Sequence, residues 1–361
     1  MNKVIDLNAK RNASLDFMKF FFSVMIVLFH SCWCIDVSIT RVVGGGYLAV
    51  EFFFICSGLF MAASASKAND EISLGVQTKS FLVKKVKGLM PNFLVAWILA
   101  FIIRHIGAEN AVIIEHAINS FWSLFLLQYT GIRTYSPIGP TWYISAMLLA
   151  MLLLYPLLVK YKDTFYYVIA PIVFLFLMGY TWQEWETLKS PGIWNGFMLH
   201  GTMRAIMEIS LGCLCYKVGT FIKGVKFTQL SRVILSLLEI NGYLLATIFM
   251  VTDRISKREW ILVILLAVSI TISFSKCGAI KNIMPSLSGW LGEYSYSLFL
   301  AHYTWAMTLK TFLPGLELKE MVMVYVVISA ITGLFVMYVS KGISALWKKN
   351  KNKIKSLFIE Q

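Results

Sequence analysis

The chain alternates between long apolar runs and short polar loops, many of them basic. About 20 consecutive apolar helical residues cross the hydrocarbon core of a bilayer, and ten runs approach or reach that length. They cover residues 14–34, 47–66, 88–106, 141–160, 164–181, 204–221, 232–251, 259–275, 290–309 and 321–341. A further amphipathic stretch, 111–130, is typical of an interfacial or re-entrant helix. The pattern predicts an all-α polytopic membrane protein with one transmembrane domain, 1–345, and a basic tail, 346–361.

The basic residues gather in alternate loops, and this predicts the orientation of the chain. Cytoplasmic loops carry an excess of lysine and arginine. With ten spans, the basic groups at 3–11, 67–87, 160–162, 217–226, 276–281 and 348–355 all fall on one side. Both termini are therefore predicted to be cytoplasmic. One loop, with Arg254, Lys257 and Arg258, breaks the pattern on the outer side.

Composition and charge narrow the class of protein. Hydrophobic residues make up 58% of the chain and aromatic residues 15%, which is far from the composition of soluble domains. The net charge of +14 would suit nucleic-acid binding if it were concentrated on one domain. Because it is distributed over loops as a topology signal, nucleic acid is excluded as a partner, and membrane lipids are expected instead.

Two ionisable residues of the first apolar run, Lys19 and His30, are predicted to share one helix face. They are eleven positions apart, and eleven steps return a helix to within about 20° of its starting direction, about 16 Å further along the axis. Ionisable side chains at membrane depth usually face a protein interior or a wet cavity. His30 suits a general base, and Lys19, with Asp16 as an ion-pair partner, suits an anionic donor. The alternative is that Lys19 and His30 extend to the two membrane interfaces.

The second apolar run contains a carboxylate, Glu51, that is followed by three phenylalanines. A carboxylate in such surroundings needs a polar environment. Glu51 is therefore either a site residue or a helix-end carboxylate at the outer interface. Ser57 and Gly58, further along this run, favour close helix packing over catalysis.

A lysine cluster, Lys84, Lys85 and Lys87, precedes Pro91 at the predicted cytoplasmic end of the third run. Its charge suits phosphate binding, and it equally suits anionic lipid headgroups and topology signalling. Taken alone, these residues favour the lipid interpretation.

Polar residues in the later runs have simpler interpretations. His302, a single histidine in an apolar run, favours a packing role, and Arg204 with Glu208 favours a local ion pair. Glu239 is expected to face the bundle interior or to bond to a neighbouring helix. The six cysteines contain no CxxC pair and no metal-ligand spacing, so no metal site is predicted.

Together, four segments resemble the membrane-bound acyltransferase-3 family, which includes bacterial O-acetyltransferases of surface glycans. They are SLDFMKFFFSVMIVLFH, with a basic residue, ten spacer residues and a histidine; GGGYLAVEFFFICSGLFM, with an acidic residue ahead of Ser-Gly; the basic run before Pro91; and LGEYSYSLFLAHYTW. GPTWYISAMLLAMLLLYPLL also resembles the family's central tryptophan-containing helix. The resemblance covers about residues 14–341.

The resemblance implies an O-acyltransferase of the bacterial cytoplasmic (inner) membrane. Acyl-CoA, with acetyl-CoA as the expected donor, would approach from the cytoplasm and place its phosphates near Lys19 and the Lys84–Lys87 cluster. The acceptor would be a hydroxyl of a glycan or lipid-linked saccharide on the periplasmic side. His30, with Glu51, would be catalytic, either by deprotonating the hydroxyl or by carrying the acyl group. The further candidate site residues are Asp16, Trp142, Ser145 and His302.

Three positions depart from the family's pattern. Lys19 stands where many members have arginine, and it lacks the planar fork that grips phosphate. Gly88 stands where arginine is common, so the donor clamp depends on Lys85 or Lys87 instead. Tyr143 follows Trp142, and the glutamate frequent in that region is absent.

Two other classes of protein would also place charges within the membrane. A transporter or flippase for a lipid-linked sugar or small solute is the main alternative, and a non-catalytic scaffold is another. Transporters commonly interrupt matching helices in their two halves, and the glycines and prolines here are not paired in that way. The sequence therefore favours the acyltransferase, and it leaves acetyl and succinyl groups both open.

Overall fold

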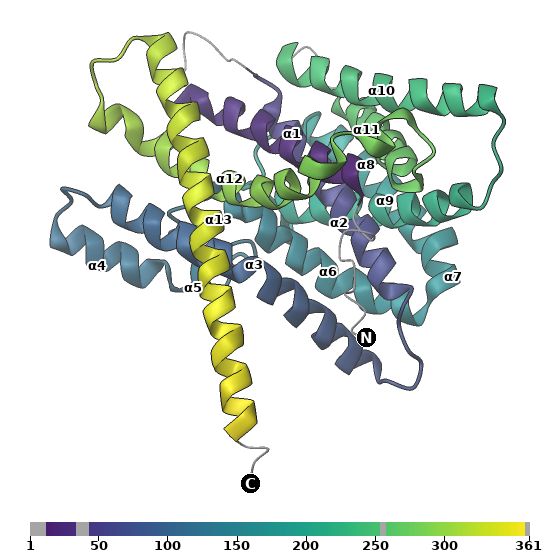
Figure 1. Cartoon of the computed structure of the whole chain (residues 1–361), viewed down its shortest axis with the longest axis horizontal. Helices are drawn as coiled ribbons and strands as arrows, with labels where there is room; N and C mark the ends of the chain where they lie inside the picture. Colours follow the sequence, from purple (N-terminus) through teal and green to yellow (C-terminus); the bar gives the residue numbers. More distant parts are fainter. Residues whose placement is uncertain (1–11, 34–42, 253–257, 358–361) are drawn as a thin grey trace.

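The structure is a computed structural model, and it describes residues 12–33, 43–252 and 258–357. It is almost entirely helical (Figure 1). The α-helices are α1 Ala13–His30, α2 Ala49–Ala65, α3 Leu74–Arg104, α4 Asn110–Asn119, α5 Phe121–Leu124, α6 Trp142–Lys160, α7 Lys162–Thr164, α8 Ala170–Trp185, α9 His200–Lys223, α10 Gln229–Thr252, α11 Glu259–Ser275, α12 Pro285–Phe312 and α13 Leu318–Leu357.

Short elements join these helices. The 3-10 helices are η2 Ser31–Trp33, η3 Gly46–Leu48, η4 Gly139–Thr141 and η6 Ala279–Asn282, and the π-helix η5 Phe165–Ile169 lies between α7 and α8. Two short antiparallel strands, β1 Trp194–Asn195 and β2 Met198–Leu199, precede α9.

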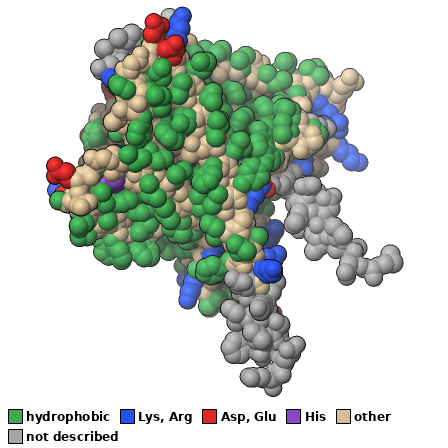
Figure 2. Space-filling view, turned by 60° about the vertical axis from the view of Figure 1, so that its left-hand side comes forward, with side chains coloured by type: hydrophobic (Ala, Val, Ile, Leu, Met, Phe, Trp, Pro, Cys, Tyr) green, Lys and Arg blue, Asp and Glu red, His purple; other side chains and the backbone are tan. Residues whose placement is uncertain are grey.

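Eight helices of the described chain are long and apolar enough to cross a membrane, by length and composition alone. Two predicted spans are not among them: α11 has 17 residues, and α12 is longer but less apolar. Figure 2 shows a broad hydrophobic face with Lys, Arg, Asp and Glu side chains gathered towards its edges. The chain is therefore an all-α polytopic membrane protein, and the sidedness of its termini stays a prediction.

Two outer segments differ from their predicted form. The 111–130 stretch is not one helix but two short ones, α4 and α5, with Ile114, Ile118 and Phe121 exposed, as an interfacial segment would have them. The helix α13 runs unbroken to Leu357, so most of the predicted tail is helical, and its end projects past the other helices in Figure 1. The basic residues at 3–11, together with Arg254 and Lys257, lie outside the described residues.

Closely packed helices determine where the candidate site lies. The helix α2 packs along α9, α1 along α12, and α12 along α13. Where α2 and α9 cross, a Cβ added to Gly58 would overlap the carbonyl group of Ile209, and one added to Gly212 would overlap that of Ile55. The predicted packing role of Gly58 is confirmed, since only residues without a side chain allow these backbones to approach so closely.

This crossing predicts a strong effect of one methyl group. We expect Gly58→Ala to destabilise the protein by about 1–3 kcal/mol, because the added carbon would force two backbones apart. Gly179→Ala in α8 is the matched control, since a Cβ there meets nothing within 4 Å and alanine is the better helix former. Thermal unfolding in one detergent measures both variants, and equal melting temperatures would contradict the close crossing.

A buried carboxylate on α10 joins this helix to α11. Glu239 accepts a hydrogen bond of 2.6 Å from the Ser273 hydroxyl and one of 3.2 Å from the Ile280 backbone N–H. The predicted bond from Glu239 to a neighbouring helix is therefore confirmed. These hydrogen bonds explain why a carboxylate occurs in this apolar run, so Glu239 needs no catalytic role.

Candidate active site

His30, the last residue of α1, lies beside His302 of α12. Nδ1 of His30 is 3.2 Å from Nε2 of His302 and 2.9 Å from the carbonyl oxygen of Ile26. Nδ1 of His302 is 3.3 Å from the carbonyl oxygen of Leu298. His302 is fully buried. It is therefore not an isolated packing residue, as its apolar run suggested, but one half of a histidine pair.

These contacts assign the tautomers of the two neutral rings. A carbonyl oxygen only accepts hydrogen bonds, so His30 carries its proton on Nδ1, shared between Ile26 and Nε2 of His302. His302 likewise carries its proton on Nδ1, towards Leu298. Nε2 of His30 is then the ring nitrogen that accepts a proton. This is the arrangement a general base requires, and His302 is the group that maintains it.

His30 lines a cavity of about 350 Å³, which we name the histidine cavity. The other polar and aromatic residues that line it are Phe29, Tyr47, Trp142, Lys189, Ser190, Arg204, Phe299 and Tyr303. The ring of Tyr303 packs edge-on against His30, with centroids 5.6 Å apart. A concave site with aromatic walls and a few polar groups is typical of small-molecule binding.

Arg204 brings a positive charge to the histidine cavity. Its guanidinium forms an ion pair with Glu51, which joins α9 to α2 with both side chains buried, and it lies 5.5 Å from the centre of the Trp142 ring. The predicted ion pair between Arg204 and Glu208 is wrong, because the carboxylate within ion-pair distance of the Arg204 guanidinium is that of Glu51. The closer partner comes from another helix, which spacing along α9 does not reveal.

Glu51, predicted to be catalytic, lies behind Arg204. It is fully buried, and it is absent from the described residues that line the histidine cavity. Its contact with Arg204 makes it a positioning residue, which holds the guanidinium at the wall of that cavity. Glu51 does lie in the first turn of α2, as the helix-end alternative required, but it is buried between helices and does not reach the outer interface.

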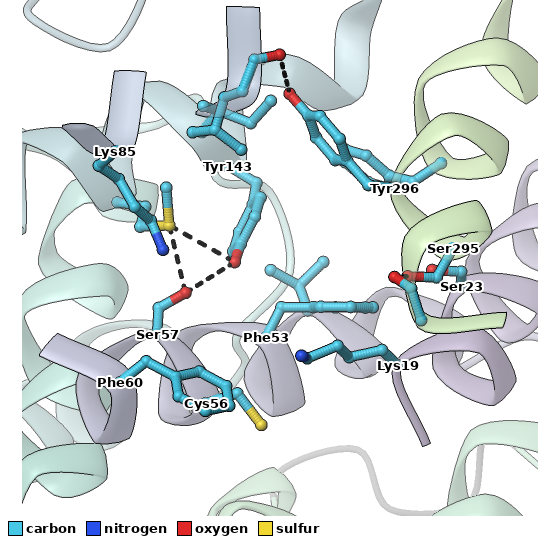
Figure 3. A pocket seen from close by; sticks show the side chains of 16 residues that line it. Lys19, Ser23, Phe53, Cys56, Ser57, Phe60, Lys85, Tyr143, Ser295 and Tyr296 are labelled. Atoms are coloured by element: carbon cyan, nitrogen blue, oxygen red, sulfur yellow. Dashed lines mark hydrogen bonds between the residues drawn. The ribbon is translucent and has the colours of Figure 1, made fainter. Parts of the chain in front are cut away.

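A second cavity, of about 200 Å³, lies next to the first, and we name it the middle cavity. Lys19 of α1 and Lys85 of α3 extend into it from different helices (Figure 3). Its wall also carries the Ser57 hydroxyl, 3.1 Å from the hydroxyl of Tyr143. Two predicted donor-binding lysines therefore meet in one largely apolar space.

The remaining lysines of the Lys84–Lys87 cluster point elsewhere. The helix α3 begins at Leu74, so the whole cluster is helical, and successive side chains turn by about 100°. Lys84 and Lys87 are exposed, and neither is among the described residues that line the histidine cavity or the middle cavity. Of the two lysines expected to replace the missing arginine at Gly88, Lys85 lines the middle cavity and Lys87 does not.

Val50 and Phe299 line both cavities and separate them. The ring of Phe299 lies 6.0 Å from that of Tyr143 on one side and 6.0 Å from that of His302 on the other. The predicted channel between Lys19 and His30 is thus two cavities in series.

The other candidate residues have supporting positions. Asp16 forms the predicted ion pair with Lys19, at 2.9 Å. Trp142 lines the histidine cavity beneath Arg204. Ser145 is fully buried, and its hydroxyl accepts a hydrogen bond of 3.1 Å from the Tyr129 backbone N–H. This bond anchors a loop, and Ser145 is not one of the described residues that line the two cavities.

Sequence reasoning missed the participation of Arg204 and Tyr303. Both lie on helices whose apolar runs were recognised, but their partners are on distant segments. The one signal for Arg204 was its charge within a spanning run, which by itself marks a functional candidate. Tyr303 follows His302 directly, and nothing in the sequence distinguishes it from the aromatic residues around it.

In this helical membrane bundle, a histidine and an arginine thus line one cavity, and two lysines line the next. The family model described as an acyltransferase domain matches residues 12–341. The chain therefore belongs to the membrane-bound acyltransferase-3 family and is a multi-pass membrane acyltransferase. Neither a curated protein nor a solved structure matches the chain.

Proposed function

We propose that the protein moves an acyl group, with acetyl as the expected one, from acyl-CoA to a hydroxyl of a cell-envelope glycan. The observation that carries this proposal is the sequence of two cavities, one lined by Lys19 and Lys85 and the next by His30 and Arg204, with Val50 and Phe299 between them. The cavity lined by Lys19 and Lys85 suits an anionic donor, and the aromatic histidine cavity suits a sugar. The thioester would cross the partition to reach His30.

The proposed reaction is a direct transfer. Nε2 of His30 takes the proton of the acceptor hydroxyl, and the oxygen attacks the thioester carbonyl carbon. The carbon–sulfur bond then breaks, the carbon–oxygen ester bond remains, and the proton passes from His30 to the leaving thiolate. The imidazole is restored, and no other reactant is needed.

Arg204 is suited to the charge that develops during this reaction. The attack places a negative charge on the carbonyl oxygen, and a buried, preorganised cation is more effective there than one in water. The Nε of Arg204 has no hydrogen-bond partner, so the guanidinium keeps donor capacity beyond its bond to Glu51. Trp142 and Tyr303 offer flat faces against which a sugar ring would pack.

The setting of the reaction follows from the predicted orientation. The lysine-lined side would face the cytoplasm, where acyl-CoA is made, and the histidine cavity would open towards the periplasm of a bacterial inner membrane. Burial between helices would keep water from hydrolysing the thioester.

Proteoliposomes test this function against the transporter alternative. We expect purified protein to transfer radiolabelled acetyl groups from acetyl-CoA to envelope polysaccharide or a lipid-linked saccharide, with mass spectrometry showing one added acetyl group per site. Deletion of the gene should remove the same mass from the polysaccharide of cells. Unmodified saccharide that crosses the bilayer without acetylation would instead support a flippase.

A further inference from the structure

Three lysines from three helices converge on a hollow next to the middle cavity. Lys19 comes from α1, Lys223 is the last residue of α9, and Lys276 directly follows α11. The hollow has a volume of about 350 Å³, and we name it the lysine hollow. Its residues belong to segments far apart in the sequence, so the convergence is a product of the fold.

The charge of the lysine hollow favours an anion. Among the described residues that line it, Asp16 is the one acidic side chain, and it forms an ion pair with Lys19 at 2.9 Å. Lys223 and Lys276 add two further positive charges, and both are exposed. Flexible ammonium groups that reach into one space are a common means of binding phosphate.

The walls of the lysine hollow are suited to a flat ring. Phe60 and Phe274 both line it. The Lys19 ammonium lies 4.8 Å from the centre of the Phe60 ring, and that of Lys223 lies 3.4 Å from the centre of the Phe274 ring. A nucleobase would stack on these ring faces in place of the ammonium groups, which would then be available to the phosphates.

The lysine hollow adjoins the route to the histidine. Lys19 and Phe60 line both this hollow and the middle cavity, as Val50 and Phe299 line both the middle and the histidine cavity. A long molecule with an anionic end in the hollow would therefore extend past Lys85 towards His30. The three spaces lie in the order that such a molecule requires.

We propose that the lysine hollow binds the nucleotide end of the acyl-CoA donor, with Lys223 and Lys276 on its phosphates. This assignment rests on the proposed function, and it places the phosphates here rather than on the exposed Lys84 and Lys87. An anionic lipid headgroup has the same phosphate chemistry, so the experiment has to separate the two sources.

The test uses the full chain in nanodiscs made only of zwitterionic lipid. We expect Lys223→Ala/Lys276→Ala to raise the KM for acetyl-CoA by about tenfold or more, with kcat within twofold, and to weaken binding of CoA in calorimetry by the same factor. Lys84→Ala/Lys87→Ala removes the same charge from exposed positions and should leave both values within twofold. Lys223→Arg/Lys276→Arg keeps the charge and should retain most of the wild-type affinity for CoA. That result would exclude misfolding as the cause of the loss in the alanine pair.

Two results would overturn this assignment. The first is an equal KM in the two alanine pairs. The second is an unchanged CoA affinity together with lost binding of phosphatidylglycerol in discs that contain it, which would make the hollow a lipid site. Either result leaves the proposed function intact if the wild type transfers acetyl groups and His30→Ala does not.

Discussion

Replacing His30 by alanine is expected to lower the rate of acyl transfer by at least about 100-fold, because a positioned general base typically contributes that much or more. The effect should fall on kcat, since His30 lines the histidine cavity and not the lysine-lined spaces. The affinity for acetyl-CoA, measured by calorimetry, should remain close to that of the wild type. Transfer is measured with radiolabelled acetyl-CoA in proteoliposomes.

The chain offers a matched control for this substitution. His105, which directly follows α3, also belongs to a histidine pair, with its Nε2 2.8 Å from Nδ1 of His116, and it is also largely buried. It is not among the described residues that line the histidine cavity, the middle cavity or the lysine hollow. His105→Ala should keep most of the activity, and equal activity in His30→Ala and His105→Ala would remove the basis of the proposed mechanism.

The sequence was most informative where one helix contains the whole pattern. The spacing of Lys19 and His30 could be evaluated from helix geometry alone, and both residues do line cavities. Gly58 was assigned to packing for a similar local reason. The apolar runs likewise predicted the helical class, because the length needed to cross a bilayer is a property of each run.

The sequence was least informative where two helices meet. His302 is 272 positions from His30, and Glu51 is 153 positions from Arg204, so neither pair appears as a motif. Local spacing instead suggested Glu208 as the partner of Arg204. The division of the route by Val50 and Phe299 was also beyond prediction, since two apolar residues in apolar runs have no distinguishing feature.

The ion pair of Glu51 and Arg204 should be among the most sensitive contacts in the protein. Both side chains are fully buried, and a further buried carboxyl group, that of Glu208, lies one turn away from Arg204 on the same helix. Breaking a buried pair by removing one partner typically costs about 3–5 kcal/mol, because the remaining charge is left without compensation. Arg204→Met should therefore destabilise the fold and also abolish transfer, as it removes the cation from the histidine cavity.

A double-mutant cycle separates the energy of the contact between Glu51 and Arg204 from the other contributions of each side chain. We expect Arg204→Met with Glu51→Gln to be more stable than Arg204→Met alone, because the glutamine removes the charge that the missing arginine had balanced. Unfolding in detergent measures stability, and proteoliposome transfer measures activity. Activity should stay low in the double variant while stability recovers, since Glu51 acts through Arg204 and cannot replace it. If the two single effects simply add, within about 0.5 kcal/mol, the two side chains are not coupled, and the positioning role of Glu51 is wrong.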